Sequence, residues 1–262
     1  TGEKANVKIT AVNSKFAFGD AVKILKKSKD RINAPCKYAH PEGCGGCDFQ
    51  HIDIKTQLNF KKIVIQDQFK RIAKIDINPD LISADSNSGL NWRSRLNLGI
   101  SENKKLGLRS HKSNKIIEID ECLIALKEIN KLDVFSKHWK NNDNIKISCS
   151  SENDITISHL GGKISGSDKL KEVVGDNKFN ISPQSFWQSH KSAPGIILEQ
   201  VLKFANIKKG ERVCDLYGGV GLFTLPISKI IGENGEVHLI ETNRTCIDDA
   251  NEMFADLKNI FI

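Results

Sequence analysis

Three cysteines in the stretch CKYAHPEGCGGC, residues 36–47, are the side chains best suited to chemistry. Seven residues separate Cys36 from Cys44, and two glycines separate Cys44 from Cys47. Glycine has no Cβ, so the backbone can turn tightly there and direct its N–H groups inward. Three thiols with amide donors around them suit a soft metal ion or an iron–sulfur cluster. A fourth ligand has to come from elsewhere, and Cys122 in EIDECLIAL is the candidate.

Two other interpretations of these cysteines stay open. A C-x-x-C pair is also half of a four-cysteine structural zinc motif. A lone pair of this kind is compatible with ordinary buried thiols as well. The double glycine and the distant fourth cysteine favour the cluster.

Composition limits the class of protein. The chain has 262 residues, enough for two or three domains, and a formal net charge of +7, which favours a polyanionic partner. Its seven cysteines are an odd number in a chain too long for a small disulfide-stapled domain, which indicates a reducing cytosol. The sequence contains no apolar run of membrane-spanning length and no signal peptide. It starts at Thr1 and stops in NIFI, which resembles the start of a strand, so we expect further residues at both ends.

The first 75 residues contain elements that could position the cysteine stretch. Two β-rich basic runs, VKITAV and AVKILK, predict part of a small barrel of the kind that often binds RNA. The basic residues there also fit a merely solvated edge. Residues 48–75 predict a long amphipathic helix, whose apolar stripe we expect to be buried in the core: Ile54, Leu58, Ile65, Phe69 and Ile72.

From Trp92 the periodicity changes to that of strands. In WRSRLNLGI, Arg93 and Arg95 share one face, and in the following run LGLRSHKSNKIIEI, Arg109 and His111 share another. Two antiparallel strands that present these side chains would form a surface that reads phosphates or bases. A plain solvent-exposed sheet face explains the pattern equally well.

The stretch GERVCDLYGGVGLFTLPIS, residues 210–228, predicts a strand, a glycine-rich turn and a helix. This arrangement lets the backbone approach a nucleotide closely. VHLIE then predicts a second parallel strand ending in Glu241, whose carboxylate could bind ribose hydroxyls. A dinucleotide fingerprint would need glycine at the position of Thr224. Its absence favours S-adenosylmethionine over NAD or FAD, although a tight turn without a ligand is also possible.

Together these motifs resemble the RNA uridine-5-methyltransferase family, which makes 5-methyluridine in ribosomal or transfer RNA. The resemblance covers nearly the whole chain in the family's order. The long gap between the first two thiols is similar to the actinobacterial branch. The matching segments are the cysteine stretch with DFQH, then WRSR, GLRSH, Cys122, FWQSH, DLYGGVGLFTLP and Glu241.

The resemblance implies roles for particular residues. A 4Fe–4S cluster that shapes the RNA-binding domain would be held by Cys36, Cys44, Cys47 and Cys122. S-adenosylmethionine would be bound by Gln188, Tyr217, Gly219, Gly221 and Glu241. RNA would lie near Arg93, Arg95 and Arg109. Many family members have asparagine where this chain has Leu222, so the resemblance does not extend to that cofactor contact.

The family's chemistry also implies residues that this sequence does not supply. A cysteine thiolate adds to carbon 6 of uracil, carbon 5 takes the methyl group, and a carboxylate removes the proton from carbon 5. In the family both residues lie downstream of the second ribose-binding strand, so we expect them after residue 262. Cys214 and Cys246 fall on a core strand and on the next helix, where packing roles are expected.

The resemblance therefore implies a multi-domain α/β protein, cytoplasmic and monomeric, that uses S-adenosylmethionine and RNA and contacts no membrane. We predict an OB-like barrel remnant over residues 1–30 and an iron–sulfur α+β domain over residues 31–181. The incomplete Rossmann-like methyltransferase domain would occupy residues 182–262. The alternative is a non-catalytic RNA-binding protein whose cysteines hold zinc.

Overall fold

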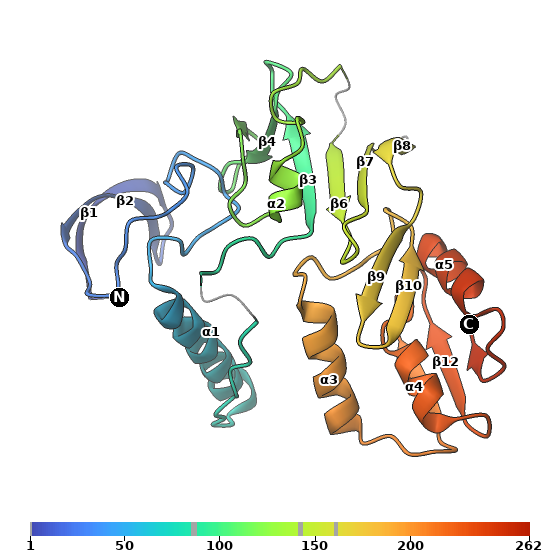
Figure 1. The fold of residues 1–262 in the computed structure, drawn as a ribbon. Helices are drawn as coiled ribbons and strands as arrows, with labels where there is room; N and C mark the ends of the chain where they lie inside the picture. Colours follow the sequence, from blue (N-terminus) through green and yellow to red (C-terminus); the bar gives the residue numbers. More distant parts are fainter. Residues whose placement is uncertain (1, 85–87, 141–143, 160–161) are drawn as a thin grey trace. The chain divides into compact units, whose positions relative to one another are not determined.

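The computed structural model describes residues 2–84, 88–140, 144–159 and 162–262 (Figure 1). The chain divides into two compact units, each built from two separate stretches of sequence. The first unit contains Thr1–Ser83 and Gly107–Ile119, and the second contains Ala84–Leu106 and Asp120–Ile262. The three-part division expected from the sequence remains a prediction.

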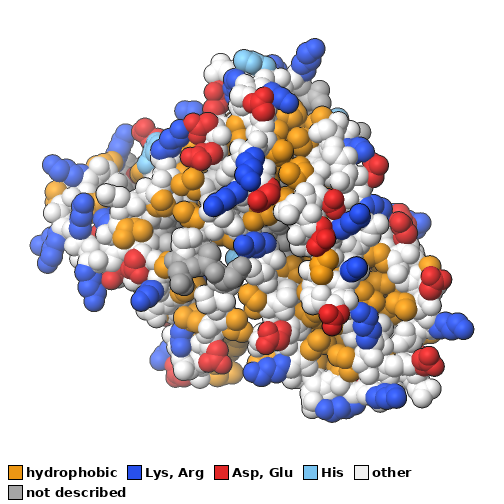
Figure 2. All heavy atoms as spheres, viewed as in Figure 1, with side chains coloured by type: hydrophobic (Ala, Val, Ile, Leu, Met, Phe, Trp, Pro, Cys, Tyr) orange, Lys and Arg blue, Asp and Glu red, His pale blue; other side chains and the backbone are white. Residues whose placement is uncertain are grey.

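The first unit begins with an antiparallel hairpin of β1 (Lys4–Val12) and β2 (Ala17–Lys26). A second hairpin pairs β4 (Leu106–Arg109) with β5 (Ile116–Glu118). Lysine and arginine side chains gather over the first hairpin (Figure 2). The exposed lysines of this hairpin and the residue after it are Lys4, Lys8, Lys15, Lys23, Lys26 and Lys27. This unit therefore presents a basic surface.

Helix α1 (Ile54–Gln68) is the main helix of the first unit, as the periodicity predicted. Its N-cap residue Asp53 accepts a hydrogen bond from the Thr56 N–H at 3.0 Å, which satisfies one of the unpaired amides of the first turn. A single π-helical segment, Phe69–Ala73, extends α1, and Lys74 ends it in the left-handed conformation at φ 59°.

The expectation that the apolar stripe of this helix is core was wrong. No residue of α1 or of its π-helical extension is buried, and Ile72 at the end of the stripe is 78% exposed. Among the described residues of this unit, Ile119 is the one large apolar side chain that is buried. Periodicity identifies which residues share a helix face, but it cannot tell whether another element covers that face.

The second unit starts with an antiparallel sheet in the order β3–β6–β7–β8. These strands are β3 (Arg95–Ile100), β6 (Ile145–Cys149), β7 (Ile155–His159) and β8 (Gly162–Gly166). The short helix α2 (Lys127–Asn130) lies between β3 and β6 in sequence. Alternating residues such as Leu96, Leu98, Ile145 and Ile147 are fully buried and form the apolar face of this sheet.

The remaining elements of the second unit are an antiparallel hairpin, a helix and a parallel α/β arrangement. Strands β9 (Leu170–Val174) and β10 (Asn177–Ile181) form a hairpin, and α3 (Ala193–Ala205) follows it. Strands β11 (Arg212–Leu216), β12 (Glu236–Ile240) and β13 (Ile260–Phe261) then pair in parallel. They are connected by α4 (Thr224–Ile231) and α5 (Arg244–Phe254) (Figure 1). This alternation matches the strand–turn–helix order that the sequence predicted.

The β9–β10 hairpin shares one hydrophobic core with the parallel sheet region. Phe179 and Ile181 of the hairpin belong to the same buried cluster as Trp187, Val220 and Leu222. The hairpin and the glycine-rich turn are therefore fixed to each other by packing. None of the helices in the described part of the chain has the length and apolar character of a membrane-spanning segment.

Candidate functional site

The turn after β11 has a backbone that only particular residues can adopt. Gly219 and Gly221 have φ angles of 59° and 89°, and the non-glycine residue Tyr217 also lies at φ 59°. A Cβ on Gly221 would lie 2.5 Å from the ring of Phe254 on α5, so a larger residue cannot fit there. Tyr217 is 84% exposed, and a bulky residue held in the left-handed region in this way is typical of binding sites.

Glu241 follows directly after the neighbouring strand β12, and its carboxylate hydrogen-bonds to this turn. Its Oε2 accepts a hydrogen bond from the Gly219 N–H at 2.9 Å, and its Oε1 accepts bonds from the N–H groups of Thr242 and Asn243 at 2.7 and 2.9 Å. The backbone hydrogen bond from Asn243, with those from Thr242 and Gly219, lowers the pKa of Glu241. An ionised carboxylate therefore meets the glycine turn at the carboxyl ends of two parallel strands, where open α/β sheets bind ligands.

Thr224 has a structural role in the position where a dinucleotide fingerprint requires glycine. Its Oγ1 donates to Oδ2 of Asp215 at 2.7 Å. Both residues are buried, and burial raises the pKa of Asp215. Leu222, which stands where many family members have asparagine, is 8% exposed and packs in the core. Neither side chain is available to a ligand in this structure.

The segment that carries Gln188 is held from two sides. On α5, the carboxylate of Asp249 accepts hydrogen bonds from Ser182 Oγ at 2.7 Å and from Ser185 Oγ at 2.5 Å. From β3, Arg95 Nη1 donates to the Ser185 carbonyl at 2.7 Å. Gln188 itself is half-buried beside the buried Trp187. The position of Gln188 therefore depends on anchors from distant parts of the chain.

The cysteine stretch forms a loop in the first unit that packs against the β4–β5 hairpin. The Gly45 N–H donates to the Arg109 carbonyl at 2.9 Å, and a Cβ on Gly45 would lie 2.6 Å from the backbone nitrogen of His111. The Gly46 N–H points at Cys44 Sγ at 3.3 Å. The double glycine predicted both features: a backbone that packs closely at Gly45, and an N–H group, that of Gly46, that donates to a cysteine sulfur.

The loop's donor set fits a thiophilic metal or cluster, because it combines thiols with an amide that can donate to a thiolate. Among the described residues, however, the structure shows no group of three or more His, Cys, Asp or Glu side chains arranged to hold a metal ion. Cys36, Cys44 and Cys47 belong to the first unit, whereas Cys122 belongs to the second. The four-cysteine site remains a prediction.

Comparisons with known proteins point to one functional class. No protein-family model matches the sequence. An uncharacterized RNA methyltransferase of Streptomyces coelicolor is 27% identical, over 100% of this chain and 66% of its own. The 23S rRNA (uracil(1939)-C(5))-methyltransferase RlmD of Vibrio parahaemolyticus is 26% identical, over 95% of this chain and 67% of its own.

The chain is similar in sequence to proteins named RNA methyltransferases. It spans about two thirds of the length of these relatives. Among solved structures, the Pyrococcus abyssi tRNA (uracil-54, C5)-methyltransferase in complex with S-adenosyl-L-homocysteine superposes with a TM-score of 0.70. That match is 18% identical and covers 97% of this chain and 70% of the other. That match shows a shared methyltransferase fold. Together with the sequence similarity to proteins named RNA methyltransferases, it confirms the resemblance based on the motifs.

The three arginines expected near RNA differ in their surroundings. Arg109 on β4 is exposed, and Arg93 is half-buried, with its Nε donating to the Arg95 carbonyl at 3.0 Å. Arg95 is only 7% exposed, and burial lowers its pKa to about 10. The expectation that Arg95 lies on an accessible face is wrong for this structure. The residue is instead part of the interior of the second unit.

Sequence reasoning missed the buried polar residues that hold the site together. Asp215 was hidden in an apolar strand, and Asp249 was one of two adjacent acids on a polar helix. A buried acid can be recognised from sequence only when its helix face is known, and Asp249 shares the buried face of α5 with Cys246 and Ala250. Cys246 is 1% exposed, as expected of a packing residue, whereas Cys214 is exposed, contrary to the core position expected for it.

Proposed function

We propose that this protein methylates carbon 5 of a uridine in ribosomal or transfer RNA, with S-adenosylmethionine as methyl donor. Similarity to RNA methyltransferases along the whole chain supports the reaction class. The observation that carries the proposal is the contact between Glu241 and the Gly219 N–H, at the carboxyl ends of β11 and β12. This geometry suits an adenosine moiety with two ribose hydroxyls.

Each residue of the cofactor site has a proposed task. Glu241 accepts hydrogen bonds from the ribose hydroxyls, for which its ionised state is suited. Gly219 and Gly221 let the backbone approach the ligand, and the exposed ring of Tyr217 covers it. Gln188 contributes a polar contact from the anchored segment after Ser185. S-adenosylmethionine, when bound, supplies an electrophilic methyl group.

We further propose that the reaction uses a covalent adduct between a cysteine thiolate and carbon 6 of uracil. Carbon 5 of uracil is a poor nucleophile until a thiolate has added next to it. The target base must leave its stack to be reached. Cys246 is buried inside α5 and Cys214 lies within β11, so we assign the nucleophile to neither.

RNA binding is proposed for the first unit and for Arg93. The exposed lysines of the β1–β2 hairpin and Arg109 supply positive charge for phosphates. Arg95 is only two residues from Arg93, but its guanidinium is buried and cannot contact RNA. We propose that Arg95 instead positions Ser185 and the segment that carries Gln188. The proposed 4Fe–4S cluster would be held by Cys36, Cys44, Cys47 and Cys122 and would cross-link the RNA-binding region structurally.

The cofactor site is tested by replacing Glu241 with glutamine. We expect about tenfold weaker binding of S-adenosylmethionine, because a neutral amide is a poorer acceptor for hydroxyl donors than a carboxylate. Isothermal titration calorimetry measures the affinity. Glu236→Gln is the matched control, because Glu236 lies at the other end of the same strand and pairs with Arg212. Equal affinities in both variants would remove Glu241 from the site.

A further inference from the structure

The sheet face of the second unit that carries Arg95 is polar, and the proposed cofactor site leaves most of it unused. Arg95 on β3 lies opposite Ser148 on β6, and Lys146 lies two residues away along β6 on the same face. The Cys149 N–H donates to the Ser94 carbonyl at 2.9 Å, which makes Arg95 and Ser148 a non-hydrogen-bonded pair. Side chains of such pairs lie close together, and long side chains reach their diagonal neighbours. Arg95, Ser148 and Lys146 therefore form one cluster.

Two buried polar atoms of this cluster have no hydrogen-bond partner among the described residues: Arg95 Nη2 and Ser148 Oγ. Both side chains are deeply buried, Arg95 at 7% and Ser148 at 1% exposure. The other terminal nitrogen of the guanidinium, Nη1, donates to the Ser185 carbonyl at 2.7 Å and so holds the group in place. Because buried polar groups are almost always paired, these two atoms indicate a bound ligand or an ordered water molecule.

The charges around the cluster do not cancel. Burial lowers the pKa of Lys146 to about 8, and the neighbouring Arg95 adds to this shift, so both groups are cationic at neutral pH. Glu172 acts on Arg95 electrostatically, but its Oε2 accepts a hydrogen bond from the Ser151 N–H at 3.0 Å, and burial raises its pKa. The thiol of Cys246 is the other acidic group that acts on both cations. Two cations thus face a carboxylate whose charged form burial disfavours, which leaves positive charge in excess.

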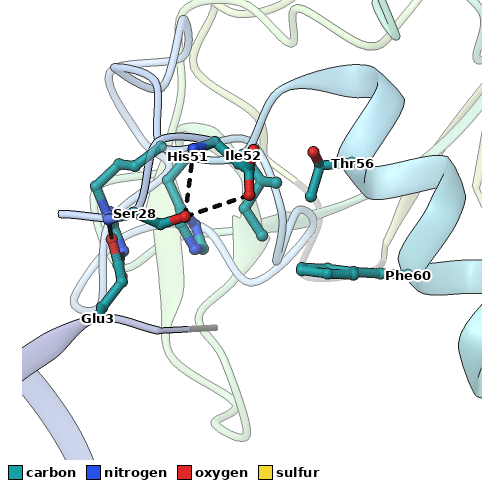
Figure 3. A pocket seen from close by; sticks show the side chains of 8 residues that line it. Glu3, Ser28, His51, Ile52, Thr56 and Phe60 are labelled. Carbon is teal, nitrogen blue, oxygen red and sulfur yellow. Dashed lines mark hydrogen bonds and ion pairs between the residues drawn. The ribbon is translucent and has the colours of Figure 1, made fainter.

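A second polar cluster, in the first unit, shows the opposite situation. Figure 3 shows Glu3 and Ser28 on one side of a cavity of about 30 Å³, with Thr56 and Phe60 of α1 on the other. Arg31 donates from Nε and Nη2 to the two carboxylate oxygens of Glu3, at 2.5 and 2.6 Å. These charges satisfy each other, and the cavity has room for little more than water. An excess of buried positive charge therefore distinguishes the cluster around Arg95.

We propose that the cluster binds one chloride ion, which accepts hydrogen bonds from Arg95 Nη2, Ser148 Oγ and the Lys146 ammonium group. Arginine and lysine are donors only, and a hydroxyl can donate, so the three groups together select an acceptor that carries negative charge. Water could fill a hydrogen bond but could not offset the charge. An RNA phosphate, with a nucleotide on either side, cannot enter between side chains this deeply buried, whereas half-buried Lys146 leaves an approach for a single ion.

The test is thermal unfolding of the full chain at neutral pH while sodium chloride replaces sodium gluconate at constant ionic strength. A ligand that binds only the folded state raises the melting temperature, and we expect a saturable rise of about 2–4 °C. Gluconate is too large for the cluster, and constant ionic strength keeps the screening of surface charges unchanged. Circular dichroism measures the melting temperature. A melting temperature that does not respond to chloride would overturn the proposal.

Variants identify the ligands of the ion. Lys146→Gln should weaken the apparent affinity for chloride about tenfold, because it removes a charged donor, and Ser148→Ala should weaken it several-fold. Lys171→Gln is the matched control, because Lys171 is exposed on β9 and the substitution changes the net charge equally. Equal losses in the two lysine variants would show a general charge effect and overturn the assignment. Stabilisation by inorganic phosphate but not by chloride would also overturn it.

A crystallographic measurement decides even if the variants unfold. Bromide can take the place of chloride and scatters X-rays anomalously. Crystals of the wild-type chain soaked in sodium bromide should show an anomalous peak within hydrogen-bond distance of Arg95 Nη2 and Ser148 Oγ. Peaks confined to exposed lysines would show an adventitious ion only, and ordered water in the cluster would contradict the proposal.

The anion site and the proposed function can fail separately. Chloride-dependent stability in protein that binds neither S-adenosylmethionine nor RNA would reject the proposed function and support the anion site. Retained binding of S-adenosylmethionine and RNA without any chloride dependence would reject the anion site alone.

Discussion

Replacing Asp249 by alanine is expected to lower the free energy of unfolding by about 2–3 kcal/mol, the usual cost of removing a buried charged acceptor from its hydrogen bonds. The carboxylate is 1% exposed and binds Lys169 Nζ at 2.5 Å. It also accepts hydrogen bonds from the Ser182 N–H and from the hydroxyls of Ser182 and Ser185. Its removal leaves these donors without their acceptor, and the Ser185 hydroxyl among them is fully buried. Urea unfolding followed by circular dichroism measures the change.

Asp248→Ala is the control for this experiment. Asp248 precedes Asp249 on the same helix but is 55% exposed and pairs with Arg244 across one helical turn. Such pairs contribute about 0.3–0.5 kcal/mol, so this variant should remain close to wild type. Similar losses in the two variants would mean that the effect comes from α5 rather than from the anchoring carboxylate.

The Asp249 effect should also depend on pH. Burial tends to raise the pKa of Asp249, but hydrogen bonds from Lys169, Ser185 and Ser182 outweigh it and lower the pKa. The stabilisation is therefore fully present above the unfolded-state pKa of about 3.9 and is lost as the pH falls through the lower folded-state value. The stability gap between wild type and Asp249→Ala should narrow below about pH 4. A gap that stays constant into stronger acid would contradict this assignment.

Anaerobically purified protein is expected to contain about four iron atoms per chain, and Cys44→Ser should lose most of them. The thiolate of Cys44, toward which the Gly46 N–H points, would be one of the proposed cluster ligands. Cys149→Ser is the control. Cys149 is buried in β6, and burial raises its pKa to about 11, which keeps it a neutral thiol. Iron and acid-labile sulfide assays measure both variants.

Two results would change the interpretation of the cysteine loop. One tightly held zinc ion in colourless protein would favour the structural zinc site that the C-x-x-C spacing also allows. Equal iron loss from Cys44→Ser and Cys149→Ser would mean that the cysteine loop is not the cluster site.

The arrangement of the glycine turn and Glu241 could be predicted from sequence because it depends on local geometry. The order of strand, glycine turn, helix and acid-ended strand specifies its own arrangement, since parallel strands bring their carboxyl ends to one edge. The contact between Gly219 and Glu241 follows from that rule and is present at 2.9 Å. Local sequence was sufficient here because Gly219 and Glu241 lie within one β–α–β unit, whereas Gln188 lies outside it.

Positions that depend on distant packing could not be predicted. The alternation around Arg95 identified which residues share a side of the strand, but Arg95 is buried because the distant Ser185 segment lies beside it. The prediction that the apolar stripe ending at Ile72 is buried was wrong for the opposite reason, because nothing among the described residues of the unit covers that helix face. Asp249 was missed because its partners, Lys169 and Ser182, lie more than sixty positions away in sequence.

Methyl transfer to RNA tests the central claim most directly. The complete gene product would be incubated with RNA from cells that lack its gene and with S-adenosylmethionine labelled in the methyl group. The RNA would then be digested to nucleosides and separated by liquid chromatography with mass spectrometry. The account predicts that the label appears in 5-methyluridine. Label in another nucleoside, or no transfer by protein that binds both S-adenosylmethionine and RNA, would contradict it.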